Sequence, residues 1–332
     1  MISSSTAKIS EFFSICLHLV HESGRIIQSV YDSKDFEKQW KGKDDPVTQA
    51  DIHVQTLLST GLRFFYPQIK IVGEEDVEFK GNLNYDFSKI NKALIPDALY
   101  QKGNNEFDLE ESIVWIDPLD GTLSYVNHEL DAVCTLIGVS YKKRPILGMV
   151  GEYYKRNADG TTFSYDPKVF FGHKDTKAVH YVYDHELMSP TSGFMGEGSM
   201  IPWELKPHEN VDIEKNFRVV CTQHRIDEKM IARMNEINGK YVKMGGSGHK
   251  INQVIEGKSD CYFYDRPGTK KWDTCAGEAI LLALGGILTG MKGDVYEYTG
   301  DNDDLPNKDG VLAMLNKEHH EKIIKITKEF KL

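Results

Sequence analysis

Two aspartates stand close together after an apolar segment in the first half of the chain. Asp117 and Asp120 follow residues 113–116, flank Pro118 and precede Gly121. Aspartate is uncommon in strands and is rarely buried without a partner. Proline presets a turn, and glycine allows a ligand to approach the backbone closely. The pattern therefore predicts a turn that directs both carboxylates, and a carbonyl between them, toward one point.

Other acidic residues stand in similar local settings. Glu74 and Glu75 follow a short apolar segment and a glycine. Asp51 and Asp273 each stand at the start of a helical pattern. Acids are common in the first turn of helices, so these two residues, each taken alone, are more simply explained as caps. Carboxylates that crowd into one place, however, repel one another unless a proton or a metal ion neutralises them.

The donor types narrow the choice of metal. No Cys or His stands at ligand spacing near these acids, so only oxygen ligands are offered. Oxygen ligands favour a hard cation, with Mg²⁺ first and Mn²⁺ as a substitute. Several acids indicate two or more ions, which in phosphoryl chemistry neutralise phosphate charge and generate a hydroxide. The acidic residues therefore predict a metal-dependent reaction at phosphorus.

Strands and helices that alternate along the chain must position these acids. Apolar spacing predicts an amphipathic helix over residues 9–30, with residues 3–5 as candidate N-caps, and a second helix over residues 51–65. Further expected elements are strands at 69–72, 113–116, 217–221, 260–264 and 311–315, a hairpin at 132–141 and 145–153, and helices at 227–237, 250–256, 273–284 and from 317. Because hairpins accompany the alternation, a mixed, layered α/β fold is favoured over a pure Rossmann domain.

Length and composition limit the number of domains and the kinds of partner that can be expected. The chain has 332 residues, of which 40% are hydrophobic and 27% are charged, and its net charge is −10. This length predicts one two-lobed globule or two tightly packed domains. We expect one continuous globule, with an α/β lobe at residues 1–165 that contains most of the clustered acids and a second α/β lobe at residues 166–332 that contains Asp273 and the pocket for a nucleotide or phosphate. The negative charge argues against sequence-independent nucleic-acid binding.

Targeting signals and cysteine usage favour a cytoplasmic protein. The first residues lack the basic and apolar segments of a signal peptide, and no apolar run is long enough to span a membrane. The five cysteines are scattered and contain no C-x-x-C pair. We therefore expect reduced thiols, no membrane association and a monomer.

Three separated motifs resemble those of the Mg²⁺-dependent, lithium-sensitive phosphatases of the inositol monophosphatase superfamily. In chain order they are Gly73-Glu74-Glu75, Trp115-Ile116-Asp117-Pro118-Leu119-Asp120-Gly121-Thr122 and Trp272-Asp273-Thr274-Cys275-Ala276-Gly277. The resemblance implies a layered α/β/α/β/α sandwich. It also implies that Glu74, Asp117 and the Leu119 carbonyl bind a first metal ion. Asp117, Asp120 and Asp273 would bind a second, and a third ion would be held loosely near Glu74.

The same resemblance implies roles in catalysis. Thr122, paired with Asp51, would activate the attacking water. The backbone amides of Gly121 and Thr122 would contact the phosphate.

Within the superfamily, the likeness is greatest to the 3′(2′),5′-bisphosphate nucleotidases. It rests on residues 45–51, 245–251 and 267–276, which read DPVTQAD, GGSGHKI and PGTKKWDTCA. The resemblance implies that Cys221, His224, Gly246, Lys250 and Asp273 contact the substrate. There are departures from the nucleotidase pattern: Gly277 in place of proline, Leu123-Ser124 in place of Lys-Glu, and Cys221 in place of Ser or Thr.

A pocket for a second phosphate is also expected from the residues themselves. Basic side chains gather around the carboxy-terminal motifs: His224, Arg225, His249, Lys250, Arg266, Lys270 and Lys271. The glycine-rich turn at residues 245–248 precedes a helix, and free N–H groups at a helix start attract phosphate. Taken alone, such a turn is more often a plain helix start, and a lone histidine or lysine pair is more often on the surface.

Two other kinds of protein are considered. The segment L-D-G-T-L at residues 119–123 is similar to the haloacid-dehalogenase signature, whose first Asp is a nucleophile. Two residues separate the acids here, not one, so that alternative is less favoured. A binding module without turnover is also less favoured, because Asp51, Thr122 and all the expected metal ligands are present.

The sequence therefore predicts a Mg²⁺-dependent phosphatase that converts adenosine 3′,5′-bisphosphate to AMP and phosphate. The sulfated form of that nucleotide is a further candidate substrate. The alternative is an inositol polyphosphate 1-phosphatase, or an enzyme with both activities.

Overall fold

The computed structural model describes residues 5–42, 45–76, 81, 83, 85–100, 105–176, 179–183, 203–205 and 216–329. The strands are β1 (Thr6–Lys8), β2 (Gln39–Gly42), β3 (Asp45–Val47), β4 (Lys70–Gly73), β5 (Glu106–Asp108), β6 (Ser112–Asp120), β7 (Cys134–Tyr141), β8 (Arg144–Arg156), β9 (Phe163–His173), β10 (Val179–Tyr183), β11 (Trp203–Leu205), β12 (Arg218–Thr222), β13 (Lys240–Met244), β14 (Cys261–Tyr264), β15 (Ile287–Thr289) and β16 (Val311–Met314). The helices are α1 (Ile9–Ser33), α2 (Gln49–Phe65), α3 (Thr122–Val126), α5 (Glu228–Glu236), α6 (Ser247–Ile255), α7 (Lys271–Ala283) and α8 (Lys317–Thr327).

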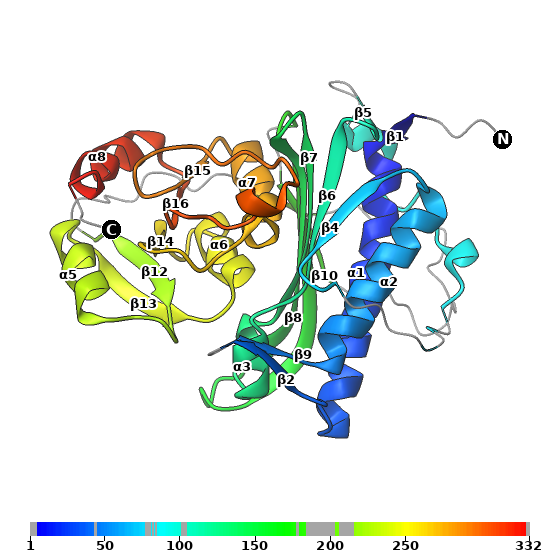
Figure 1. The fold of residues 1–332 in the computed structure, drawn as a ribbon, viewed down its shortest axis with the longest axis horizontal. Helices are drawn as coiled ribbons and strands as arrows, with labels where there is room; N and C mark the ends of the chain where they lie inside the picture. Colours follow the sequence, from blue (N-terminus) through cyan, green and yellow to red (C-terminus); the bar gives the residue numbers. More distant parts are fainter. Residues whose placement is uncertain are drawn as a thin grey trace.

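The larger sheet has the strand order β11-β10-β9-β8-β7-β6-β4 in the described part of the chain. Its neighbours are antiparallel except for β4 and β6, which run parallel. Helices α1 and α2 cover one face of this sheet (Figure 1). Both helices bury an apolar stripe against it, so their amphipathic spacing is explained by this contact.

The smaller sheet has the order β13-β12-β14-β16-β15. Strands β12, β13 and β14 are parallel, and β16 is antiparallel to both of its neighbours. Helices α6 and α7 lie between the two sheets, and α5 and α8 lie outside the smaller one (Figure 1). This arrangement confirms the expected mixed α/β fold and its layers of helix, sheet, helix, sheet and helix.

Glycines on the larger sheet let α7 approach it closely. A Cβ atom at Gly148 would lie 2.0 Å from the carbonyl oxygen of Ala276, and one at Gly138 would lie 2.6 Å from the Ala276 nitrogen. On the other side of the same helix, a Cβ at Gly277 would lie 2.4 Å from Ile251 of α6. The middle helix layer therefore depends on small residues at three contacts.

Several predicted elements are confirmed, and their boundaries differ by a few residues. Strands β7 and β8 form the expected hairpin, whose turn residues Lys142 and Lys143 both have positive φ. Helices α6 and α7 begin earlier than predicted, at Ser247 and Lys271. Of the expected N-caps, residues 3 and 4 lie outside the described residues, and the residue before α1 is Lys8.

The predicted turn after residue 116 is wrong in one respect. Strand β6 continues through Asp117 to Asp120, and an irregularity separates the pairs Asp117–Leu136 and Asp120–Cys134. A bulge thus replaces the turn, since the antiparallel partner strand β7 continues alongside. The structure also has strand β13, which the sequence did not predict.

Three further expectations concern the lobe boundary, the cysteines and membrane-spanning helices. The lobe boundary at residue 165 stays a prediction; the larger sheet continues past it to Leu205. All five cysteines are free and buried. Among the described residues, no helix combines the length and the apolar composition needed to cross a membrane.

Candidate active site

The first acidic residues come together where two parallel strands end. The register between β4 and β6 pairs Gly73 with Ile116, which places Glu74 beside Asp117. The Glu74 amide donates to the Ile116 carbonyl over 3.0 Å, so the backbone of this glutamate is tied to β6. Lys41, from the β2–β3 hairpin, forms an ion pair with Glu74 at 3.2 Å.

The bulge at the end of β6 fixes the positions of the next acids and of the Leu119 carbonyl. The Leu119 amide donates to Asp117 Oδ1 over 3.1 Å, and the Pro118 carbonyl accepts from Thr135 over 2.8 Å. The Leu119 carbonyl accepts from the Thr122 hydroxyl over 2.9 Å. These bonds fix the backbone of the bulge, so its carboxylates and the Leu119 carbonyl have defined positions.

Asp120 and Asp273 complete the cluster from two different elements. One carboxylate oxygen each of Asp117, Asp120 and Asp273 lies within 4.8 Å of the others. Asp273 lies in the first turn of α7, where it accepts from the Lys270 amide over 2.5 Å. The last strand residue of β6 and the first turn of α7 therefore present their acids to one point.

The two oxygens of Asp120 also hold the start of α6. Oδ1 accepts from the Ser247 amide over 2.8 Å, and Oδ2 accepts from the Gly248 amide over 2.6 Å. Gly246, just before the helix, has φ of +60°, and a Cβ there would lie 2.4 Å from the Ala132 carbonyl. The start of α6 was expected to attract phosphate. In this structure two amides of its first turn donate to the Asp120 carboxylate instead.

The carboxylates of the cluster are held in a strongly unfavourable environment for negative charge. Burial, with the neighbouring charges of Glu74, Asp120 and Asp273, raises the pKa of Asp117 well above its ordinary value. Burial and the charge of Glu74 raise the pKa of Asp273 to about 8. Burial also raises the pKa of Asp120, although the nearby Lys250 opposes that shift. Such crowded oxygen donors fit a hard divalent cation, which would stabilise their ionised forms.

Thr122 and Asp51 form a hydrogen-bonded pair beneath the cluster. The Thr122 hydroxyl lies 2.9 Å from Asp51 Oδ1 and at the same distance from the Leu119 carbonyl. Asp51 is 2% exposed, and its second oxygen accepts from the amide and the hydroxyl of Thr48 at the start of α2. Burial raises the pKa of Asp51 to about 7, although its bonds to Thr48 oppose the shift. Asp51 is therefore both the cap of α2 and a group able to hold a proton near neutral pH.

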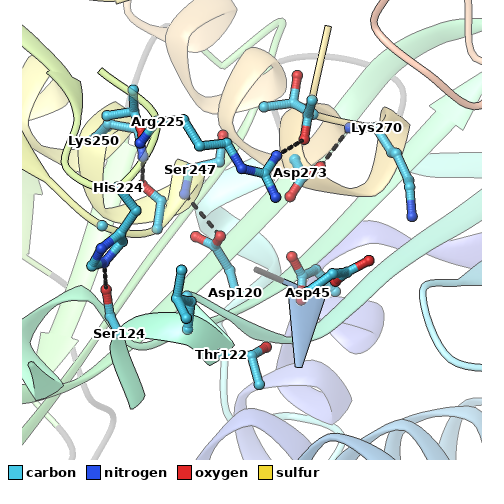
Figure 2. Close-up of a pocket in the computed structure, with 18 of the residues that line it drawn as sticks. Asp45, Asp120, Thr122, Ser124, His224, Arg225, Ser247, Lys250, Lys270 and Asp273 are labelled. Carbon is cyan, nitrogen blue, oxygen red and sulfur yellow. Dashed lines mark hydrogen bonds between the residues drawn. The ribbon is translucent and has the colours of Figure 1, made fainter. Parts of the chain in front are cut away.

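A cavity of about 360 Å³ opens beside these groups (Figure 2). Its lining residues are Asp45, Pro46, Glu74, Asp117, Leu119, Asp120, Gly121, Thr122, Leu123, Ser124, Thr222, His224, Arg225, Gly245, Gly246, Ser247, Lys250, Tyr262, Tyr264, Gly268, Thr269, Lys270, Trp272 and Asp273. The acids of β6 and α7 line this cavity together with His224, Arg225 and Lys250, which come from the loops and the helix that follow β12 and β13. Such a cavity suits a small molecule that carries negative charge.

Most of the predicted site residues lie together in this cavity. Glu74, Leu119, Gly121, Thr122, Gly246 and Asp273 line it beside Asp117, Asp120, His224 and Lys250. Asp51 does not line the cavity itself, but it accepts a hydrogen bond from the hydroxyl of Thr122, which does. Cys221 is fully buried, and its thiol donates to the Val242 carbonyl. Among the described residues, the cavity is lined at this point by Thr222 in place of Cys221.

Sequence reasoning missed part of the wall. Thr222, Tyr262 and Tyr264 line the cavity because they lie at the carboxyl ends of parallel strands β12 and β14. Ser124, noted as a departure from the nucleotidase pattern, lies 3.2 Å from His224 Nε2. If the sequence had predicted that β12 and β14 are parallel, the residues at their carboxyl ends would have been expected in the cavity, because ligands bind at that edge of a parallel sheet.

Comparisons with known proteins show the family to which the chain belongs. Residues 8–332 match the inositol monophosphatase family. A relative from Dictyostelium discoideum, 3′(2′),5′-bisphosphate nucleotidase 1, is 32% identical over 99% of both chains. The Homo sapiens protein of the same name is 29% identical, over 95% of this chain and 94% of that one. A solved structure, an IMPase/NADP phosphatase complexed with Mg²⁺ and phosphate, is 15% identical, has a TM-score of 0.64 and covers 97% of both chains.

Proposed function

The chain belongs to the inositol monophosphatase family and is a phosphoric monoester hydrolase, and from that premise we propose that it removes the 3′-phosphate from adenosine 3′,5′-bisphosphate. The products would be AMP and inorganic phosphate, and the sulfated nucleotide would be a second substrate. The observation that supports this most is the joint position of a carboxylate cluster and a basic wall in one cavity. The carboxylates, with bound metal ions, would suit the phosphate that reacts, and the basic side chains would suit a second anionic group.

The family is Mg²⁺-dependent, and the carboxylate cluster fits that metal. We propose that Glu74, Asp117, the Leu119 carbonyl, Asp120 and Asp273 hold two or three Mg²⁺ ions, with Mn²⁺ as a substitute. Bound there, the ions would neutralise phosphate charge and supply a nucleophilic hydroxide. Sensitivity to lithium and a monomeric state remain predictions.

We propose that Thr122 and Asp51 prepare the attacking water. Thr122 can donate its hydroxyl proton to Asp51 and accept a hydrogen bond from water at its lone pairs. Because the pKa of Asp51 is raised to about 7, this carboxylate can take up a proton near neutral pH. The amides of Gly121 and Thr122, at the start of α3, would contact the phosphate.

A second candidate function is inositol polyphosphate 1-phosphatase activity, alone or with the first. It is favoured by Gly277 and by Leu123-Ser124, which depart from the nucleotidase pattern. In the structure Gly277 packs against Ile251 of α6, and Ser124 lies against His224 and Gly245. Leu123 and Ser124 line the cavity itself, whereas Gly277 lies behind it, in the contact between α7 and α6.

One assay separates the two functions. Phosphate release is measured from adenosine 3′,5′-bisphosphate and from inositol 1,4-bisphosphate at equal concentrations, with Mg²⁺ present. We expect a higher catalytic efficiency on the nucleotide. Faster release from the inositol substrate would replace the proposed function by the second one.

A further inference from the structure

We propose that Arg225 binds the second, unreacted phosphate of the substrate and thereby sets the preference for bisphosphates over monophosphates. This inference rests on the proposed function and deepens it. Arg225 is exposed and lines the cavity, and it lies outside the motifs that indicated the family. Its assignment follows from the edge of the sheet at which it lies, the bonds that hold its loop, and the contacts of the neighbouring cations.

Arg225 lies at the edge of the smaller sheet where parallel strands end. Strands β12, β13 and β14 end at Thr222, Met244 and Tyr264 on the same side. The loops that follow these strands line the cavity, and Arg225 lies three residues beyond the end of β12. Loops at this edge of parallel strands are the usual place for ligand contacts in α/β folds.

The loop that contains Arg225 is held on both sides. The Arg225 amide donates to the Thr222 hydroxyl over 3.4 Å. Two residues later, Asp227 caps α5 and accepts two hydrogen bonds from Arg266, each of 2.8 Å. Arg266 also bonds Asp265 over 2.9 Å, which ties this loop to the segment after β14. The backbone that positions Arg225 is therefore fixed before any ligand binds.

The guanidinium group extends across the cavity toward the segment before α7. Its Nη1 atom lies 3.4 Å from the Gly268 carbonyl. Gly268 has φ of +149°, and a Cβ there would lie 2.2 Å from the Tyr264 hydroxyl and 3.0 Å from Arg225 Nη1. The glycine thus leaves room for the arginine. In Figure 2 Arg225 and Thr122 lie on opposite sides of Asp120, so the guanidinium lies away from Thr122, on the side of Asp273.

The charge of Lys250 is already engaged. Lys250 is 5% exposed, donates to the Gly246 carbonyl, and lies 5.2 Å from the ring centre of Tyr262. Among the neighbouring negative charges, that of Asp120 stabilises the Lys250 ammonium most. The contacts of this lysine are therefore with the turn before α6 and with the carboxylate cluster. They leave it less suited than Arg225 to bind a second phosphate.

The two other cations of the wall are less suitable. His224 Nε2 lies 3.2 Å from Glu129 and from Ser124. The Lys270 ammonium lies 4.8 Å from the ring centre of Trp272, and its side chain is on the far side of Asp273 from Arg225 in Figure 2. Arg225 is exposed and bonds the Gly268 carbonyl through Nη1, and its planar guanidinium can bind two phosphate oxygens at once. Of these cations it therefore matches a second phosphate best.

The experiment compares Arg225→Met and Arg225→Lys with the unchanged protein on adenosine 3′,5′-bisphosphate and on 3′-AMP. A hydrogen bond to a charged group is worth about 1.5–3 kcal/mol, so Arg225→Met should lower kcat/KM on the bisphosphate roughly 10- to 150-fold. The loss should appear mainly in KM and should be much smaller on 3′-AMP. Arg225→Lys should recover part of it. Arg25→Met, on the outer helix α1, is the matched control and should leave both substrates unaffected.

A second readout does not depend on turnover of the bisphosphate. The product 5′-AMP keeps the second phosphate, whereas adenosine has none. Arg225→Met should therefore weaken inhibition by 5′-AMP and leave inhibition by adenosine as it is. Equal losses on both substrates, with unchanged inhibition by 5′-AMP, would overturn the role of Arg225 and leave the proposed function intact. Absence of phosphate release from the bisphosphate by the unchanged protein would overturn both.

Discussion

Asp120 connects the carboxylate cluster to α6, the helix between the two sheets. Its carboxylate lies with Asp117 and Asp273, and the same two oxygens accept hydrogen bonds from the first amides of α6. Changing this residue should therefore affect metal binding and the position of α6 together. The sequence indicated the first role, because Asp120 follows a strand. It could not indicate the second, because the partner amides are 127 and 128 residues away along the chain.

Asp120→Asn should raise the Mg²⁺ concentration needed for half-maximal activity and lower Tm. It removes a charged ligand, and its new NH₂ group faces an amide that needs an acceptor. Calorimetric titration with Mg²⁺ and a thermal scan measure the two effects. Asp301→Asn, at an exposed acid, is the control. Metal affinity equal to that of the unchanged protein would exclude Asp120 as a ligand.

Thr122→Ala should lower turnover while metal binding stays close to normal. Loss of a positioned proton-transfer group costs roughly 10²- to 10⁴-fold in rate. Thr122→Ser keeps the hydroxyl that bonds Asp51 and should retain most of the turnover. Steady-state kinetics at saturating Mg²⁺ measure the difference. Full turnover by Thr122→Ala would show that the Asp51–Thr122 pair does not prepare the water.

At the scale of elements, the start of α7 is held by a distant segment. The Asn307 side chain is fully buried, and its NH₂ group lies 2.8 Å from the Lys270 carbonyl and 3.2 Å from the Thr274 hydroxyl. The Lys271 amide donates to the Leu305 carbonyl over 2.9 Å. These bonds position the first turn of α7, and Asp273 is part of that turn.

Asn307→Ala should therefore displace Asp273 as well as destabilise the protein. Leaving buried polar groups without partners costs about 1–3 kcal/mol of stability. We also expect weaker Mg²⁺ binding, measured by calorimetry at a temperature where the variant is folded. Asn302→Ala, at an exposed position of the same segment, is the control. A lower Tm with unchanged Mg²⁺ affinity would limit Asn307 to a purely structural role.

The elements could be predicted where the signal is local. Helices α1 and α2 have regular apolar stripes, and the β7–β8 hairpin turns at two lysines between apolar runs. Strand β13 was missed because its residues, KYVKM, alternate weakly and are mostly exposed at the edge of the sheet. The continuation of β6 through its acids was missed because pairing with β7 overrides the poor strand propensity of aspartate.

At the scale of the whole molecule, both sheets contribute to one site. Asp117 and Asp120 come from the larger sheet, and the cation wall comes from loops of the smaller one. The motifs along the chain predicted that Asp117, Asp120 and Asp273 would come together, as they do in the structure, and their role as metal ligands stays a prediction. That His224, Arg225 and Lys250 line the cavity could be predicted only in part, because it depends on which loops of the smaller sheet lie next to the bulge of β6.

The stability of the metal-free protein should depend on pH through the cluster. The folded pKa of Asp273 is raised to about 8 and that of Asp51 to about 7, so the folded state binds more protons than the unfolded state between their ordinary value of 3.8 and these values. The contribution of these groups is therefore present at low pH and is lost as pH rises toward 8. Mg²⁺ should restore more stability at pH 8 than at pH 5.5. Thermal scans with and without Mg²⁺ measure this, and an equal Mg²⁺ effect at both pH values would contradict it.

The most direct measurement follows the reaction of adenosine 3′,5′-bisphosphate by phosphorus NMR, in chelator and then after Mg²⁺ is added in excess. The carboxylate cluster and the proposed orientation of the substrate predict no reaction in chelator. After Mg²⁺ addition they predict inorganic phosphate and 5′-AMP as the products. Formation of 3′-AMP would show that the substrate binds in the reverse orientation. Full activity in chelator would show that the cluster does not act through a metal.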